Sequence, residues 1–131
     1  MRFQNMIAML AVRDIRRSVQ FYTDALQFQV VSDPDRINDW NWAVLRAPGG
    51  IEIMLAGTEN GPQLKQDEED FTAIYYFYPE DVRGLHADLQ NKSYPVTPLH
   101  STFYGMLEFG LRDPDGHLLA FGQEVDANSA D

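Results

Sequence analysis

Two carboxylates stand in apolar and aromatic stretches of this sequence, and their surroundings make them the first candidates for chemistry. Glu52 lies in "IEIML", and Glu108 lies in "FYGMLEFGLR". A carboxylate buried without a partner is costly, so these positions favour a role in binding or proton transfer over a role in packing. Aromatic faces beside carboxylates suit a planar or cationic ligand, through stacking and cation–π attraction.

Strand alternation assigns further residues to the same face as these carboxylates. In the stretch 106–112, Leu107, Phe109 and Leu111 alternate as the face that a helix covers, so Glu108 belongs to the opposite, open face. Matching "AVLR" at 43–46 with "FGLR" at 109–112 gives the equivalent assignment for the stretch 40–46. The predicted ligand-binding residues on the open faces are Trp40, Trp42, Glu52, Met54, Tyr76, Met106 and Glu108. Tyr104 is predicted at the rim, and His100 is added as a further candidate.

Three histidines are the other candidates for chemistry. His100 leads toward Tyr104 and could face the open side, where it could serve a metal or an acid–base step, or it could simply occupy a loop. His86 is expected to be partly exposed on a helix, and His117 is expected at the surface just after a turn.

The elements that must hold these side chains repeat one plan twice. "LRAPGG" at 45–50 and "LRDPDG" at 111–116 read as the same hairpin turn, because Pro fixes φ and Gly tolerates positive φ. Asp14 and Asp81 are expected to cap helices. The inward positions are Ile15, Val19, Tyr22 and Leu26 in the first helix and Val82, Leu85 and Leu89 in the second.

Strands are predicted between these signals. They cover 6–12, 28–32, 40–46 and 51–56, and then 73–78, 94–99, 106–112 and 117–122. The stretch 94–99 is assigned to a sheet edge because of its prolines, and 33–39 is assigned to a turn.

The order of elements predicts an α+β fold of two tandem βαβββ modules within one domain, residues 1–131. The modules cover about 5–56 and 71–124, and an acidic linker covers 57–70. Each sheet has one face covered by its helix and one open face. Two such modules side by side predict a concave trough of mixed sheet with the helices on its outer face.

Composition narrows the function classes. The formal net charge is −10, which argues against a nucleic-acid partner. The chain has no cysteine, so disulfides and thiolate chemistry are excluded. The start, "MRFQNMIAML", is too short and too polar for a signal peptide or a membrane span, so we expect a cytoplasmic protein without a membrane partner.

The sequence resembles the vicinal-oxygen-chelate superfamily, which includes glyoxalase I, extradiol dioxygenases and bleomycin-resistance proteins. The resemblance rests on "AVRDIRRSVQFYTDALQFQVV" and "FYGMLEFGLRDPDGHLLAFGQ" and covers about residues 5–124. It implies paired βαβββ modules that assemble as a homodimer with ligand sites in the troughs. The composition is most similar to the metal-free bleomycin-resistance branch, although Tyr104 stands where that branch commonly has tryptophan.

The resemblance also implies where metal ligands would stand. Metal-dependent members place His, Gln or Glu at positions that correspond here to Ile7, Glu52, Ile74 and Ala120. Alignment on the repeated turn would put Met54 in place of Glu52, and this choice stays open. Either set offers at most one carboxylate, whereas a divalent metal needs several donors. We therefore expect no metal and no other cofactor.

Three hypotheses for function follow. The first is a metal-free protein that binds a small molecule, and could sequester an aromatic or cationic antibiotic-like ligand. The second is a metal-dependent lyase, isomerase or dioxygenase that uses Glu52 with unusual donors such as His100 or Glu108. The third is a metal-free enzyme with a carboxylate general base. We favour binding over catalysis and leave ligand identity, and exchange of modules in the dimer, open.

Overall fold

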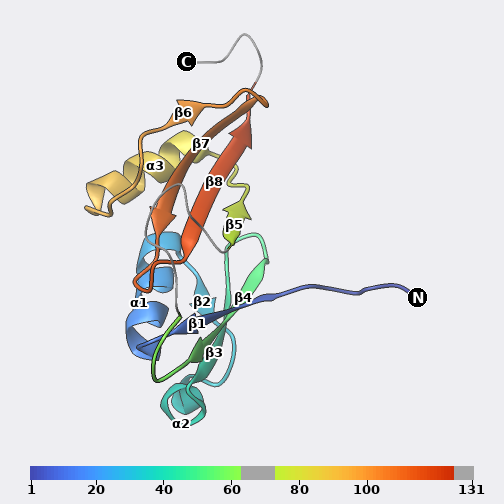
Figure 1. The fold of residues 1–131 in the computed structure, drawn as a ribbon, viewed down its shortest axis with the longest axis vertical. Helices are drawn as coiled ribbons and strands as arrows, with labels where there is room; N and C mark the ends of the chain where they lie inside the picture. The colour runs from blue at the N-terminus through green and yellow to red at the C-terminus, as the bar shows by residue number, and fades with distance from the viewer. Residues whose placement is uncertain (63–72, 126–131) are drawn as a thin grey trace. The chain divides into compact units, whose positions relative to one another are not determined.

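Each half of the chain folds as β-α-β-β-β, so the predicted α+β class and the tandem βαβββ modules are confirmed (Figure 1). The computed structural model describes residues 1–62 and 73–125. The chain divides into two units, Met1–Gln63 and Leu64–Asp131. The predicted linker 57–70 lies outside the described residues from position 63 onward, and Gly57 belongs to the last strand of the first unit.

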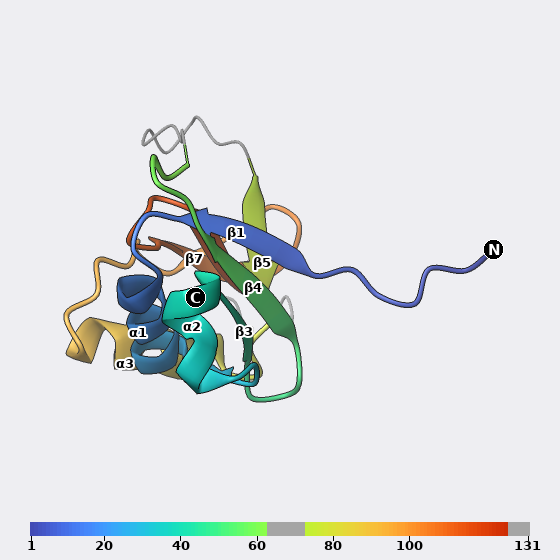
Figure 2. The same cartoon turned by 90° about the horizontal axis from the view of Figure 1, so that it is seen from below.

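The first unit is a four-stranded mixed sheet with helices against one face. Its strand order is β1-β4-β3-β2, with β1 parallel to β4 and the other pairs antiparallel. Figure 2 shows α1 and α2 beside this sheet. The elements are β1 (Ala8–Val12), α1 (Ile15–Leu26), β2 (Gln29–Val30), the 3-10 helix η1 (Pro34–Arg36), α2 (Ile37–Trp40), β3 (Trp42–Arg46) and β4 (Glu52–Gly57).

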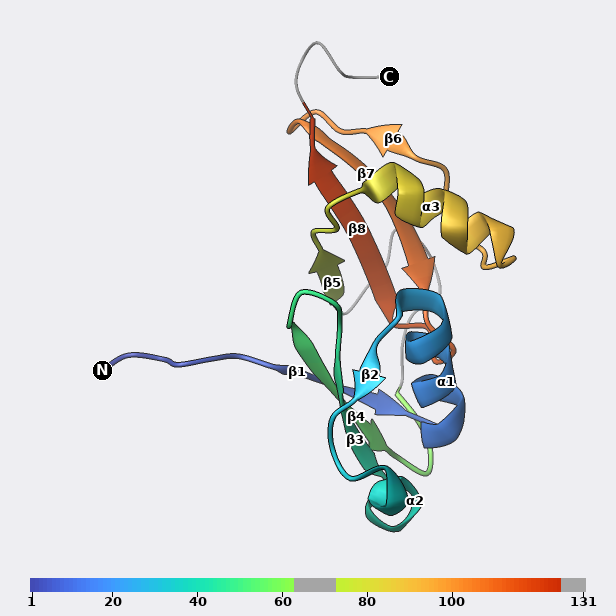
Figure 3. The same ribbon diagram turned by 180° about the vertical axis from the view of Figure 1, so that it is seen from behind.

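The second unit repeats this topology with one helix. Its strand order is β5-β8-β7-β6, with β5 parallel to β8 and the other pairs antiparallel. Figure 3 shows α3 beside β7, and the helix contacts both β7 and β8. The elements are β5 (Ile74–Phe77), α3 (Val82–Asn91), β6 (His100–Ser101), β7 (Met106–Arg112) and β8 (Leu118–Glu124).

Both long helices begin where an aspartate can satisfy free backbone N–H groups. The Asp14 side chain accepts a hydrogen bond from the backbone N of Arg17 at 3.2 Å, and the Asp81 side chain accepts one from Gly84 at 3.0 Å. Helix α1 ends at Gln27, which adopts a left-handed conformation with φ of 60°. Both predicted caps are therefore confirmed.

The two hairpins have the same register, which explains the repeated six-residue phrase. Leu45 pairs with Ile53 across β3 and β4, and Leu111 pairs with Leu119 across β7 and β8. All four side chains are buried. In each unit the two strands therefore present corresponding residues to the helix.

Alternation along the strands separates a covered face from an open face in each sheet. The buried side chains under the helices include Leu10, Ala43, Leu45, Ile53 and Leu55 in the first unit, and Leu107, Phe109, Leu111, Leu119 and Phe121 in the second. The residues between them in sequence are only partly buried or exposed. We call the face that carries these intervening residues the open face of each sheet.

The helical stripes differ slightly from the prediction. In α1 the buried residues include Ser18, Phe21 and Ala25, whereas Val19 and Leu26 are only partly buried. The buried face of α1 is therefore turned by about one residue, because Phe21 and Tyr22 both pack inward.

Two predicted strands are corrected. Trp40 belongs to the one-turn helix α2, and the strand begins only at Trp42 after Asn41 with φ of 51°. The stretch 94–99 is not a strand, because Pro95 and Pro98 cannot donate to a ladder, and β6 is limited to His100–Ser101. In the described ranges, no helix has the length and apolar character that crossing a membrane would require.

Candidate ligand-binding site

A carboxylate held by two tyrosines occupies the open face of the second sheet. The Tyr76 hydroxyl donates to Glu108 Oε2 at 2.7 Å, and the Tyr104 hydroxyl donates to Glu108 Oε1 at 2.8 Å. The Glu108 side chain is only 16% exposed. We call Tyr76, His100, Tyr104 and Glu108 the acidic cluster.

Tyr76 reaches Glu108 by crossing the strand between them. Tyr76 lies on β5 and pairs with Ala120 of β8, while Glu108 lies on β7 and pairs with Gly122 of β8. A Cβ atom on Gly122 would stand 2.7 Å from Tyr76 Cζ, closer than real Cβ atoms approach. The absence of a side chain at position 122 therefore lets the tyrosine ring lie across β8.

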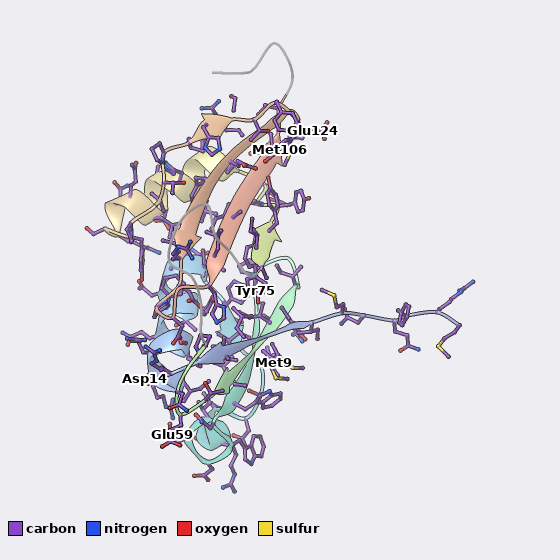
Figure 4. The ribbon with its side chains drawn as sticks, in the orientation of Figure 1. Met9, Asp14, Glu59, Tyr75, Met106 and Glu124 are labelled. Atoms are coloured by element: carbon purple, nitrogen blue, oxygen red, sulfur yellow. The ribbon has the colours of Figure 1, made fainter. Side chains whose placement is uncertain are left out.

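Tyr104 is positioned by the turn that leads into β7. The Thr102 backbone N donates to the Met106 carbonyl at 2.8 Å, and Gly105 has a φ of 81°. This turn places Tyr104 where its hydroxyl reaches Glu108, which lies on the same face of β7 as Met106. Met106 lies opposite Glu124 at the end of the β7–β8 pair, and both are labelled in Figure 4.

His100 completes the acidic cluster from the short edge strand β6. It is the cross-strand partner of Glu108, and its Nε2 lies 3.6 Å from Glu108 Oε1. Its Nδ1 lies 3.2 Å from the Pro98 carbonyl oxygen. The imidazole is 56% exposed, so it contacts both the carboxylate and solvent.

Both tyrosines of the acidic cluster are fixed as hydrogen-bond donors. Burial, followed by the hydrogen bond to Glu108, raises the pKa of Tyr76 well above its ordinary value. The hydrogen bond to Glu108 is the main cause that raises the pKa of Tyr104. Both hydroxyls therefore stay protonated at neutral pH and cannot act there as proton acceptors in catalysis.

In the first unit, Glu52 already has a charged partner. Arg46 and Glu52 pair across β3 and β4, and Arg46 Nη2 lies 2.6 Å from Glu52 Oε2. Arg46 Nε donates to the same oxygen at 2.7 Å. Glu52 is therefore an ion-paired carboxylate on the open face of its sheet.

The remaining predicted residues of the first unit lie around β3. The rings of Trp40 and Trp42 are 6.5 Å apart, although Trp40 projects from α2 and is 55% exposed. Met54 pairs with Val44 on one side and with Met9 on the other. The predicted residues thus fall into two sets, Trp40, Trp42, Glu52 and Met54 in the first unit and Tyr76, His100, Tyr104, Met106 and Glu108 in the second.

The other two histidines are buried, which corrects the prediction for both. His86 Nε2 lies 2.9 Å from the Thr97 carbonyl oxygen, and its ring packs edge-on against Phe109. The backbone N of His117 donates to Asp113 Oδ1 at 2.9 Å, and its ring packs edge-on against Tyr75. Both histidines pack within the second unit.

The positions assigned to metal ligands by the resemblance do not fit a divalent metal. Ile7, Ile74 and Ala120 offer no donor atom in their side chains, and Glu52 pairs with Arg46. Met54, not Glu52, corresponds to Ala120, since Val44 pairs with Met54 as Gly110 pairs with Ala120. Among residues 1–62 and 73–125, no three His, Cys, Asp or Glu side chains gather as a metal would need.

Two contributors were missed by the sequence prediction. Arg46 stands six positions before Glu52 around a tight turn, so hairpin geometry could have placed the two opposite one another. Gly122 interrupts an apolar strand, which is a signal of close approach by another group. The glycine signal does not identify which residue approaches.

The acidic cluster is suited to bind a positively charged group. A carboxylate has about four acceptor positions, and the tyrosine hydroxyls use one on each oxygen of Glu108. The rings of Tyr76 and Tyr78 lie 5.0 Å apart, and Tyr78 is largely exposed. Aromatic faces beside an anionic oxygen offer a cation both ionic and cation–π contacts.

The fold and the sequence together define the class of the protein. Residues 5–121 match the Glyoxalase/Bleomycin resistance protein/Dioxygenase superfamily, and the chain belongs to this superfamily. A search of curated proteins finds no match to the sequence.

Solved structures with the same fold come from several bacteria. TioX from Micromonospora sp. ML1 is 22% identical with a TM-score of 0.73, covering 94% of this chain and 100% of its own. A glyoxylase/bleomycin resistance protein/dioxygenase domain from Frankia sp. EAN1pec is 21% identical with a TM-score of 0.74, covering 97% and 96%. Lactoylglutathione lyase from Agrobacterium tumefaciens is 18% identical with a TM-score of 0.67, covering 92% and 93%. At these identities the likeness concerns the fold.

Proposed function

We propose that this protein is a metal-free binder of small aromatic or cationic molecules, of the glyoxalase/bleomycin-resistance type. It would act by sequestering an antibiotic-like ligand rather than by transforming it. We further propose that it works in the cytoplasm as a homodimer. The observation that carries the proposal is the part-buried Glu108 carboxylate, held by two tyrosine hydroxyls on the open face of the second sheet.

The chemistry of the acidic cluster supports binding more than catalysis. Its tyrosines are neutral donors, and both are already directed at Glu108. General-base catalysis requires a carboxylate within reach of a substrate proton and groups that stabilise the charge that develops. Here the available donors are directed at the carboxylate itself, which favours a role for Glu108 as a binding partner of a cation.

The open-face composition supports the same proposal. The positions where metal-dependent relatives are expected to hold a metal carry Ile7, Ile74, Ala120 and Met54, and the nearby Glu52 pairs with Arg46. Apolar walls with a few oriented polar groups are typical of small-molecule sites. Trp40 and Trp42 add aromatic surface in the first unit.

The proposal is tested by measuring ligand and metal binding on the same preparation. Calorimetric titration with metal-free bleomycin and with smaller aromatic cations should give saturable binding, and Glu108→Gln should weaken it about tenfold or more. Glu59→Gln is the matched control, because it removes the same charge from an exposed position. Elemental analysis after incubation with Mn, Fe, Co, Ni or Zn should show negligible retained metal. Near-stoichiometric uptake of one metal would contradict the proposal, and so would cation binding whose affinity is unchanged in Glu108→Gln.

A further inference from the structure

We infer that His100 is a proton-controlled competitor of the ligand for Glu108, so that binding of a cation at this carboxylate weakens as the pH falls. The inference rests on the proposed function, since it takes Glu108 as the charge partner of the ligand. Beyond that function, a residue of the same sheet regulates binding at Glu108.

The His100 ring lies between two oxygen atoms. Its Nδ1 faces the Pro98 carbonyl oxygen at 3.2 Å, and its Nε2 faces Glu108 Oε1 at 3.6 Å. A neutral imidazole carries one N–H and can donate to only one of these oxygens, whereas the imidazolium ion carries two. Protonation therefore leaves Nδ1 with the Pro98 carbonyl oxygen as its acceptor and brings a positive charge to within ion-pair distance of Glu108.

The Glu108 carboxylate can accept only a limited number of donors. Tyr76 occupies one position on Oε2, and Tyr104 occupies one on Oε1. Protonated His100 lies beside Oε1 as well, so it neutralises the charge that a cationic ligand needs. Neutral His100 leaves that charge available, and its exposed ring can turn aside for a ligand.

His100 is the imidazole of the acidic cluster, and the other groups of the cluster lie around it. The groups that face it are Glu108 from β7 and Tyr104 from the β6–β7 turn, with Tyr76 of β5 on the far oxygen of Glu108. Both tyrosines remain neutral donors at and below neutral pH. Imidazoles as a class change charge between about pH 5 and 8, and this sets the pH range of the measurements below.

The first measurement uses a probe whose own charge is independent of pH. N-methylquinolinium should bind about two- to fivefold more weakly at about pH 5.5 than at about pH 8, as expected for loss of one exposed charge pair. His100→Asn should remove this pH dependence. Tyr104→Phe is the matched control, because it removes a neutral donor from the same oxygen and should keep the pH dependence. An unchanged pH profile in His100→Asn would overturn the inference and leave the proposed function standing.

The second measurement needs no ligand. A double-mutant cycle of His100→Asn and Glu108→Gln, read by urea unfolding, should show coupling of about twofold or more in the unfolding equilibrium constant at about pH 5.5. Because the protonated form gains the partner, this coupling should vanish at about pH 8. No coupling at the lower pH overturns the inference whether or not any ligand binds. Coupling without binding of any cationic probe refutes the proposed function, and the competition with it.

Discussion

At the scale of single residues, the acidic cluster depends on a position that has no side chain. Gly122 lies between Tyr76 and Glu108, and the tyrosine ring crosses the sheet above it. Hydrogen bonds to charged groups are stronger than those between neutral groups. The tyrosine therefore contributes to stability only while the space above Gly122 stays open.

We predict that Gly122→Ala destabilises the protein by about 1–3 kcal/mol, because Tyr76 must swing aside and lose its hydrogen bond to Glu108. The midpoint of urea unfolding measures the change. Gly110→Ala is the matched control on the same face, since its Cβ would meet its nearest atom at an ordinary 3.5 Å. Equal effects of the two substitutions would show that the ring does not occupy the space above Gly122.

The sequence predicted which residues share the open face but not which of them touch. Alternation along 106–112 assigned Glu108 to that face, and the structure places Tyr76 there too. The hydrogen bond between them joins residues 32 positions apart and requires the parallel register of β5 on β8. Such non-local pairing leaves no periodic trace in the chain, so the contact could not be predicted.

At the scale of elements, each module begins its helix with the same device. Asp14 and Asp81 both stand just before the first helical turn and accept a backbone hydrogen bond there. The helices in turn cover the buried face of each sheet. Losing a cap therefore weakens the element that separates the covered face from water.

We expect Asp14→Ala to lower the free energy of unfolding by about 1 kcal/mol, because a free N–H group at the helix start loses its acceptor. Urea unfolding followed by far-UV circular dichroism measures this loss. Asp14→Asn keeps a side-chain oxygen and should restore most of the stability. If Asn proves as damaging as Ala, the contribution of Asp14 is not that of a cap.

Short elements were the least predictable part of the fold. The hairpin strands β7 and β8 were predicted to within two residues, because their turn has strong Pro and Gly signals. Helix α2 covers only four residues and was read as turn, which put Trp40 wrongly on a strand. The stretch 94–99 has apolar residues typical of a strand, but its two prolines cannot donate to a ladder.

At the scale of the whole molecule, the covered faces of the two modules carry similar residues, whereas their open faces carry different ones. Leu45 and Leu111 are equivalent and both buried, whereas Met54 on the first open face corresponds to Ala120 on the second. Burial under a helix restricts the residue type in the same way in both modules. The open faces carry no such restriction, so they can acquire different ligands or partners.

We predict that the protein is a homodimer in solution, as its superfamily resemblance implies. Large apolar side chains such as Tyr78, Met9 and Phe103 are at least half exposed in the single chain, and contact with a second copy would bury such surface. Light scattering coupled to gel filtration should give twice the chain mass of 15.0 kDa. The mass of one chain at every concentration tested would contradict this prediction.

The crossing of Tyr76 over Gly122 also constrains how such a cluster can arise by mutation. With any side chain at the equivalent of position 122, a tyrosine at the equivalent of position 76 cannot lie across the sheet in this orientation. The glycine is therefore the change that permits the crossing, and the hydrogen bond to Glu108 in this geometry requires both residues. The acidic cluster is thus specified by three positions together, 76, 108 and 122, and a glutamate on β7 does not specify it alone.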